Sequence, residues 1–119
     1  MRVIRILARA LASAAALSPA APSVAETLYC AGTSNGAYVS DQGEFILRGS
    51  WRNDYTMVCH LRQTWKGIAP ETCAFWYALM VTSQTNAKPV TVYYTNSAYT
   101  CATLPTYQAS PAPGYVMQN

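Results

Sequence analysis

The chain has 119 residues, of which 51% are hydrophobic and 11% are charged, and its formal net charge is +3. Three of its eight basic residues, Arg2, Arg5 and Arg9, lie at the very start. Residues 26–119 hold five basic and five acidic side chains, so this part has no net charge. Without a basic excess, neither nucleic acid nor an anionic membrane surface is an expected partner.

The first 25 residues have the features of a secretory signal peptide. The basic start precedes a short apolar stretch over 10–17, and Ser23-Val24-Ala25 offers small residues where a signal peptidase cuts. A membrane span would need about 20 apolar residues. We therefore expect cleavage near Ala25 and a secreted or periplasmic single domain, 26–119, in an oxidising compartment.

Three strands are predicted first. Residues 28–39 are expected to be extended, with Asn35-Gly36 as a kink in one bent strand or, alternatively, a hairpin turn. Turn-forming residues separate this segment from strands predicted over 44–51 and 55–61.

One helix is predicted next, from Pro70 to a turn that ends at Pro89. The run 73–81 is apolar on every side, so the helix has more than one face to bury. The preferred interpretation is a central core helix. The alternative is a helix with one face on the sheet and another against a neighbouring subunit.

Two further strands complete the prediction, Val90–Thr95 and a short one over 114–117 in the Pro-rich tail. If the valines of the first face inward, Tyr94 does too and Tyr93 faces solvent. Three strands, a helix and two strands is an order found in the oligonucleotide/oligosaccharide-binding (OB) barrel. The predicted fold class is mainly β with one helix, a small five-stranded OB-like barrel stapled by two disulfides.

The four cysteines are Cys30, Cys59, Cys73 and Cys101, which allow three pairings. In the barrel order we favour Cys59–Cys73, between third strand and helix, and Cys30–Cys101, between first and fourth strands. Their spacing contains no Cys-x-x-Cys pair, so structural disulfides are favoured over a zinc site. No metal and no cofactor are expected.

Catalytic chemistry is not indicated. His60 is the sole histidine, and strand alternation is expected to place it at the surface, on the face opposite Cys59. The five acids are scattered, with no pair suited to glycoside hydrolysis. The protein is therefore not predicted to be an enzyme.

The candidate ligand-binding residues are Trp51, Arg52, Asp54, Tyr55 and Tyr93. The first four share one turn and combine flat rings with charged groups, the mixture that a sugar site needs for C–H faces and hydroxyls. The alternative for this turn is a hairpin corner in which Trp51 covers the core edge and Asp54 caps the turn. Tyr93 is added as the outward member of its strand.

The segment around Cys73–Tyr94, with the runs FWYALMVTSQT, NAKPV and TVYYT, resembles the helix-to-strand segment of the B subunits of subtilase cytotoxin and related pertussis-like bacterial toxins. The resemblance implies an exported, disulfide-bonded OB-type barrel that forms a pentameric ring, binds glycans, often sialylated, and carries a catalytic A subunit. It supplies no glycan contact, because Ile68–Glu71 stands where some members have Tyr and Ser contacts.

These features together predict a secreted, non-enzymatic, glycan-binding module that forms homo-oligomers. The alternative is a small exported structural or protein-interaction domain, which needs only the stapled barrel.

Overall fold

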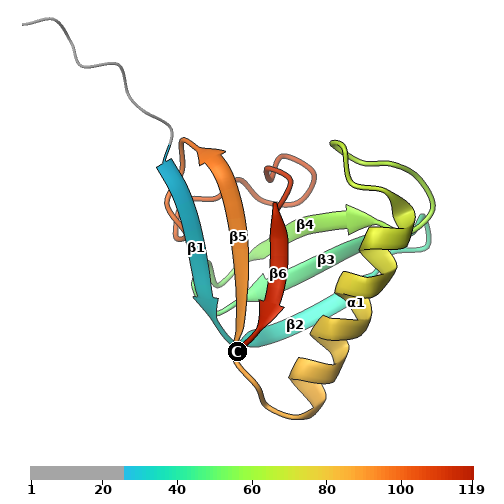
Figure 1. Ribbon diagram of the computed structural model, residues 1–119, viewed down its shortest axis with the longest axis horizontal. Helices are drawn as coiled ribbons and strands as arrows, with labels where there is room; N and C mark the ends of the chain where they lie inside the picture. Colours follow the sequence, from blue (N-terminus) through green and yellow to red (C-terminus); the bar gives the residue numbers. More distant parts are fainter. Residues whose placement is uncertain (1–25) are drawn as a thin grey trace, which may run out of the picture.

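The computed structural model describes residues 26–119, so the predicted signal peptide lies outside the described residues. This part of the chain contains six strands and one helix (Figure 1). In chain order they are β1 (Glu26–Gly32), β2 (Ser34–Val39), β3 (Glu44–Gly49), β4 (Tyr55–His60), α1 (Pro70–Thr85), β5 (Val90–Ser97) and β6 (Tyr115–Gln118).

The strands form two antiparallel three-stranded sheets, ordered β1-β5-β6 and β2-β3-β4, which cross each other in Figure 1. The sequence predicted a single five-stranded barrel. The described residues instead form six strands in two sheets, which do not close into a barrel. The extended segment predicted over 28–39 breaks at Thr33, so its halves join different sheets. Asn35-Gly36 is not the break, although the β2–β3 register shifts between Ser34 and Gly36.

Both sheets pack their inner faces into one core. Its buried members include Cys30, Val92 and Tyr94 from one sheet and Phe45, Leu47 and Val58 from the other. Tyr94 is 1% exposed, whereas Tyr93 is half-buried on the outer face, which confirms the predicted alternation of this strand.

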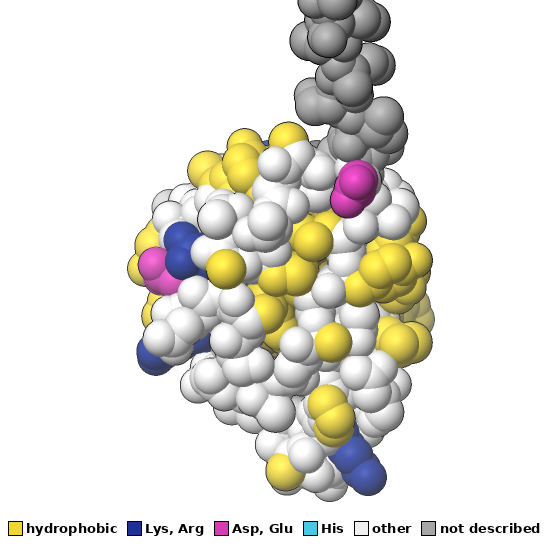
Figure 2. All heavy atoms as spheres, turned by 90° about the vertical axis from the view of Figure 1, so that its left-hand side faces the viewer, with side chains coloured by type: hydrophobic (Ala, Val, Ile, Leu, Met, Phe, Trp, Pro, Cys, Tyr) yellow, Lys and Arg dark blue, Asp and Glu magenta, His cyan; other side chains and the backbone are white. Residues whose placement is uncertain are grey.

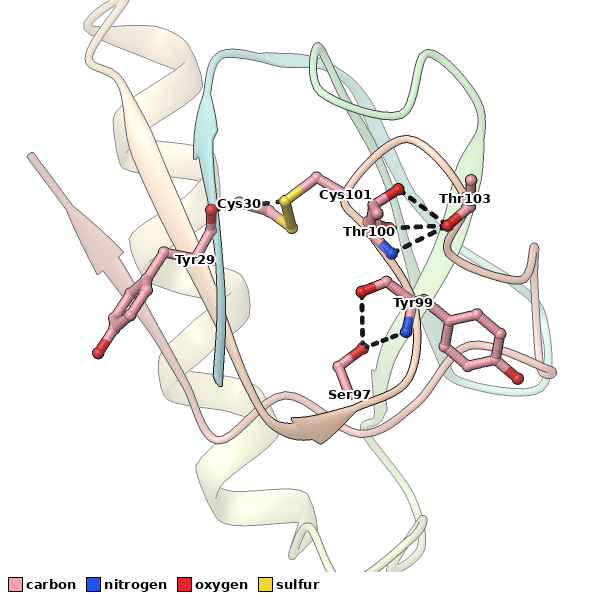
Figure 3. Close-up of a disulfide and its surroundings, with 7 residues drawn as sticks. All are labelled: Tyr29, Cys30, Ser97, Tyr99, Thr100, Cys101 and Thr103. Atoms are coloured by element: carbon pink, nitrogen blue, oxygen red, sulfur yellow. Dashed lines mark hydrogen bonds between the residues drawn. A yellow bond between two sulfur atoms is a disulfide. The ribbon is translucent and has the colours of Figure 1, made fainter. Parts of the chain in front are cut away.

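The two favoured disulfide pairings are confirmed. Cys30–Cys101 joins β1 to the loop after β5, and Cys59–Cys73 joins β4 to the first turn of α1. The Cα atoms of each pair lie 5.5 Å apart. Around the first bridge, the loop is held by local hydrogen bonds such as that from the Tyr99 N–H to Ser97 Oγ (Figure 3).

Helix α1 is covered on one side only. It packs against β2, β4 and β6, and Cys73, Met80 and Ser83 are its buried residues. Phe75 is 77% exposed and Val81 is 40% exposed. The preferred prediction of a central core helix is therefore wrong, because the helix lies beside the sheets (Figure 1). Within 26–119, no helix is long and apolar enough to cross a membrane.

Candidate functional site

His60 is buried, contrary to the predicted surface position. It is 6% exposed, and its Nδ1 accepts a hydrogen bond of 3.1 Å from the Arg62 N–H. Just after β4, the Leu61 N–H donates to the Gly43 carbonyl, which holds the turn before β3 beside the imidazole. Among the described residues, no group of three or more His, Cys, Asp or Glu side chains could hold a metal ion.

Trp51 packs at the corner where the two sheets meet. Its half-buried indole contacts the core, and it lies so close to Gly32 and Gly49 that a Cβ at Gly49 would overlap the ring. The indole N–H is buried and has no hydrogen-bond partner among residues 26–119. This placement matches the alternative interpretation of the turn, in which Trp51 covers the core edge.

Arg52 and Asp54 also make contacts within the scaffold. Arg52 Nε donates to the Leu104 carbonyl at 2.8 Å, which ties the turn to the C-terminal segment. Asp54 Oδ1 accepts from the Tyr55 N–H at 2.7 Å and so caps the turn. Of the four residues predicted in this turn, Tyr55 alone joins a wider aromatic cluster.

That cluster, here named the outer tyrosine site, consists of Tyr38, Tyr55 and Tyr107. It lies on the outer face of the β2-β3-β4 sheet. The Tyr55 ring reaches across β3, and its hydroxyl lies 3.6 Å from the position of a Cβ at Gly36 on β2. Tyr38 meets this ring edge-on, with centroids 5.5 Å apart, and Tyr107 lies nearly parallel to it at 6.3 Å. Tyr38 and Tyr107 are each 42% exposed, so the cluster is open to solvent.

Backbone contacts hold Tyr107 in place. Its N–H donates to the Tyr55 carbonyl at 2.9 Å, and its carbonyl accepts from the Met57 N–H at 3.1 Å. Its φ of 52° lies in the left-handed region, which is costly for a bulky residue. Ile46 and Met57 are paired in register on this sheet and are buried outside the main core. The rings therefore rest on a small apolar layer of their own.

Two polar pairs flank the outer tyrosine site. Arg48 lies with Cζ 5.9 Å from the Tyr55 ring centroid, and its Nη2 donates to Asn53 Oδ1 at 3.0 Å. On the same strand, the Glu44 carboxylate accepts from Gln108 Nε2 at 3.0 Å. The site thus combines ring faces with a guanidinium, a carboxylate and two amides.

The surroundings of Tyr38 affect its titration. Desolvation by burial raises the pKa of Tyr38, and the negative charges of Tyr107, Tyr55 and Glu44 raise it further. The hydroxyl therefore stays protonated at neutral pH and can both donate and accept hydrogen bonds.

The predicted mixture of groups is present, but different residues supply it. Arg48 and Glu44 take the places expected of Arg52 and Asp54. Glu44 and Arg48 alternate onto the same face of β3, and this spacing can be recognised in the sequence. Tyr107 carries no such signal, because the tail reaches β4 through a long-range contact.

A second aromatic cluster, here named the β5 tyrosine row, consists of Tyr29, Tyr93 and Tyr115. The three lie opposite one another in register on β1, β5 and β6. The centroid of Tyr93 lies 5.0 Å from that of Tyr29 and 4.5 Å from that of Tyr115. The Tyr29 ring points away from the Cys30–Cys101 bridge (Figure 3). Tyr93 and Tyr55 therefore lie on different sheets and do not share a site.

A shallow groove of about 350 Å³ runs between α1 and β2. Its lining is uncharged and consists of Ala37, Tyr77, Val81, Gln84 and Thr85. β2 is an edge strand of its sheet in the described part of the chain, so the groove lies beside unpaired backbone groups.

Comparisons of the chain with protein-family models, with curated proteins and with solved structures returned no match.

Proposed function

We propose that the protein is a secreted, non-enzymatic, glycan-binding module whose ligand binds at the outer tyrosine site. The observation that carries this proposal is the convergence of three tyrosine rings with the Arg48–Asn53 and Glu44–Gln108 pairs. Ring faces suit the C–H surface of a sugar, and the paired polar groups suit its hydroxyls. Export is proposed from the leader-like first 25 residues and is supported by the two disulfides.

We further propose that the two sheets form a partly open barrel of the OB type. If β1 and β2 are counted as one strand bent at Thr33, the sheets join into five strands ordered β6-β5-β1/β2-β3-β4. OB barrels bind ligands on the face of their second and third strands and on adjacent loops. Here those strands are β3 and β4, which carry Arg48 and Tyr55, and the loop before the last strand carries Tyr107.

The module is also proposed to form a homo-oligomer, a pentameric ring in line with the toxin resemblance. β2 and β6 are edge strands of different sheets, and α1 packs against both. If β6 of one copy paired with β2 of the next, both strand edges would be covered. Repeated head-to-tail pairing of this kind closes a ring when the rotation between copies allows it. A catalytic A subunit is proposed from the resemblance alone. Light scattering that shows a monomer would contradict the ring.

The glycan proposal is tested on an array of sialylated and neutral glycans. Tyr55→Ala should lose about tenfold or more in affinity for the glycans that bind the wild type, because central aromatic residues dominate such contacts. Tyr99→Ala is the matched control, since Tyr99 is 45% exposed and belongs to neither cluster. Absence of any glycan binding by the wild type, or equal binding by Tyr55→Ala, would overturn the proposal.

One observation favours the alternative, a protein-interaction domain. The groove beside β2 offers free backbone groups and an uncharged lining, which suits the addition of an extended strand from a protein. This alternative predicts a monomer that captures a protein partner whether or not a competing glycan is present.

A further inference from the structure

The rings of the β5 tyrosine row pack against one another without a ligand. Each ring contacts the next across adjacent strands, and the Tyr93 and Tyr115 rings are stacked within 11° of parallel. A Cβ at Gly114 would lie 2.8 Å from Tyr93 Cδ1, so the glycine leaves the space that this ring occupies. The Gly114 N–H also donates to the Tyr93 carbonyl at 2.7 Å. A preformed site avoids the entropic cost of ordering its side chains on binding.

The surface around the row is uncharged. The other exposed side chains that alternate outward on these strands are Thr27, Ala31, Thr95 and Met117. Glu26 is the one charged residue of the three strands, and it lies at the far end of β1. On the side of the molecule where β1 lies, charged side chains are few and stay at the margins of the view (Figure 2). A neutral ligand with apolar faces and hydroxyls suits such a surface better than a charged one.

Tyr29 offers the open ring face of the row. Tyr93 lies between its two neighbours, so both of its faces are covered. Tyr29 stands on an edge strand of the described sheet and is 59% exposed, compared with 39% for Tyr115. A sugar ring stacked on Tyr29 would have tyrosine and threonine hydroxyls within reach along the same face.

The two tyrosine clusters point away from each other. The sheets that carry them share one core through their inner faces, so their outer faces lie on opposite sides of the domain. A single sugar ring cannot contact both clusters.

We propose that the β5 tyrosine row is a second, independent site for neutral saccharides, so that one chain binds two glycans on opposite sides. The proposal rests on the proposed glycan-binding function and extends it. The two sites are expected to bind different classes of ligand, because the outer tyrosine site contains Arg48 and Glu44 whereas the row contains no charged group. Because the two sites face opposite ways, one domain would link two separate glycan chains rather than bind twice to one flat surface.

The test is an NMR titration of the mature protein, labelled with ¹³C in its tyrosine rings, with the neutral disaccharide N-acetyllactosamine. The ring signals of Tyr29, Tyr93 and Tyr115 should shift together on addition of the sugar. Tyr29→Ala should abolish the shifts of Tyr93 and Tyr115 and leave those of the outer tyrosine site unchanged. Tyr55→Ala should leave the shifts of the row unchanged. Both substituted rings are at least partly exposed, and the wild-type titration alone can refute the proposal.

The outcomes separate the two proposals. Shifts at Tyr38 and Tyr107 without shifts in the row would overturn the second site and leave the proposed function intact. Shifts in the row alone would support the second site and the separation of ligand classes, and the glycan array then decides the outer tyrosine site. Shifts in neither cluster would overturn the second site. Tyr29 lies on β1, away from the proposed contact of β6 between copies, so a Tyr29 signal that moves on dilution without sugar would identify the row as an interface and overturn the proposal.

Discussion

The two sheets share one core but differ on their outer faces. The β2-β3-β4 sheet carries three tyrosines above a buried layer of Ile46 and Met57, with a charged residue in each flanking pair. The β1-β5-β6 sheet carries its three tyrosines in one uncharged row. The difference shows that tyrosine alone does not define a site in this protein, because the neighbouring polar groups set which ligand each face suits.

Each sheet is linked by a different disulfide, and removal of each disulfide measures its contribution to the free energy of unfolding. The bridge in β1 spans 71 residues and the bridge in β4 spans 14. In the loop-entropy model, loss of Cys30–Cys101 by double alanine substitution should lower the free energy of unfolding by about 4 kcal/mol, and loss of Cys59–Cys73 by about 3 kcal/mol. Urea denaturation of both variants measures the two values. A larger loss for the shorter loop would contradict this ranking.

Alkaline titration tests the contact between the sheets. Tyr94 of β5 is buried in the core that the two sheets share, and this burial raises the pKa of Tyr94 from 10.0 to about 12. Because the raised pKa favours the neutral phenol in the fold, its contribution is complete below pH 10 and is lost as the pH rises to about 12. The loss should be about 3 kcal/mol in the free energy of unfolding.

Tyr94→Phe is the control for this titration. The other tyrosines ionise in the same range, so the loss assigned to Tyr94 is the difference between wild type and variant across pH 10 to 12. Parallel stability curves for the two proteins would show that Tyr94 is not responsible.

The corner between the sheets can be tested with two glycines. Gly49→Ala places a methyl group against the Trp51 indole and should destabilise the fold by about 1–3 kcal/mol, the usual range for overpacking. Gly36→Ala is the matched control, because its methyl group would meet the Tyr55 hydroxyl at an ordinary contact distance of 3.6 Å. Thermal or urea unfolding compares them. Equal effects would mean that the indole moves aside freely.

The end of the connecting helix offers the smallest effect. Ala87 has a φ of 52°, and the Lys88 N–H that follows it donates to the Ser83 carbonyl. Ala87→Gly should therefore stabilise the protein by about 0.5 kcal/mol, since glycine adopts this conformation without strain. Ala74→Gly, at an exposed position within α1, should instead destabilise it by about 1 kcal/mol. A loss of stability in both variants would contradict the proposed strain at Ala87.

Local patterns predicted most of the elements. Alternation along 90–95 placed Tyr94 inside and Tyr93 outside, and Pro70 marked the first residue of the helix. The disulfide pairing followed from the strand order, because that order brings the cysteines of each pair together. Strand and helix ends differ from the prediction by one or two residues at most positions, as expected where caps and pairing decide them.

The predictions that were wrong concern features that depend on contacts between residues far apart in the sequence. The break at Thr33 depends on the crossing of the two sheets, and the burial of His60 depends on the turn at Gly43. An apolar helix predicts burial on every side, but the number of covered faces depends on where the helix packs. Trp51 was assigned to a ligand because its sequence neighbours are polar, whereas its actual neighbours are Gly32 and Gly49.

Most of the secondary structure, the inward and outward residues of the clearest strand, and the two bridges could be predicted without a structure. These depend on backbone preference, on the period of side-chain alternation and on the order of elements, all of which are local or nearly so. Which outward residues meet depends on how the sheets and loops pack. Tyr38, Tyr55 and Tyr107 converge from two strands and a distant loop, and Tyr29, Tyr93 and Tyr115 align through strand register. Such convergence results from the packing of distant segments, which no local pattern encodes.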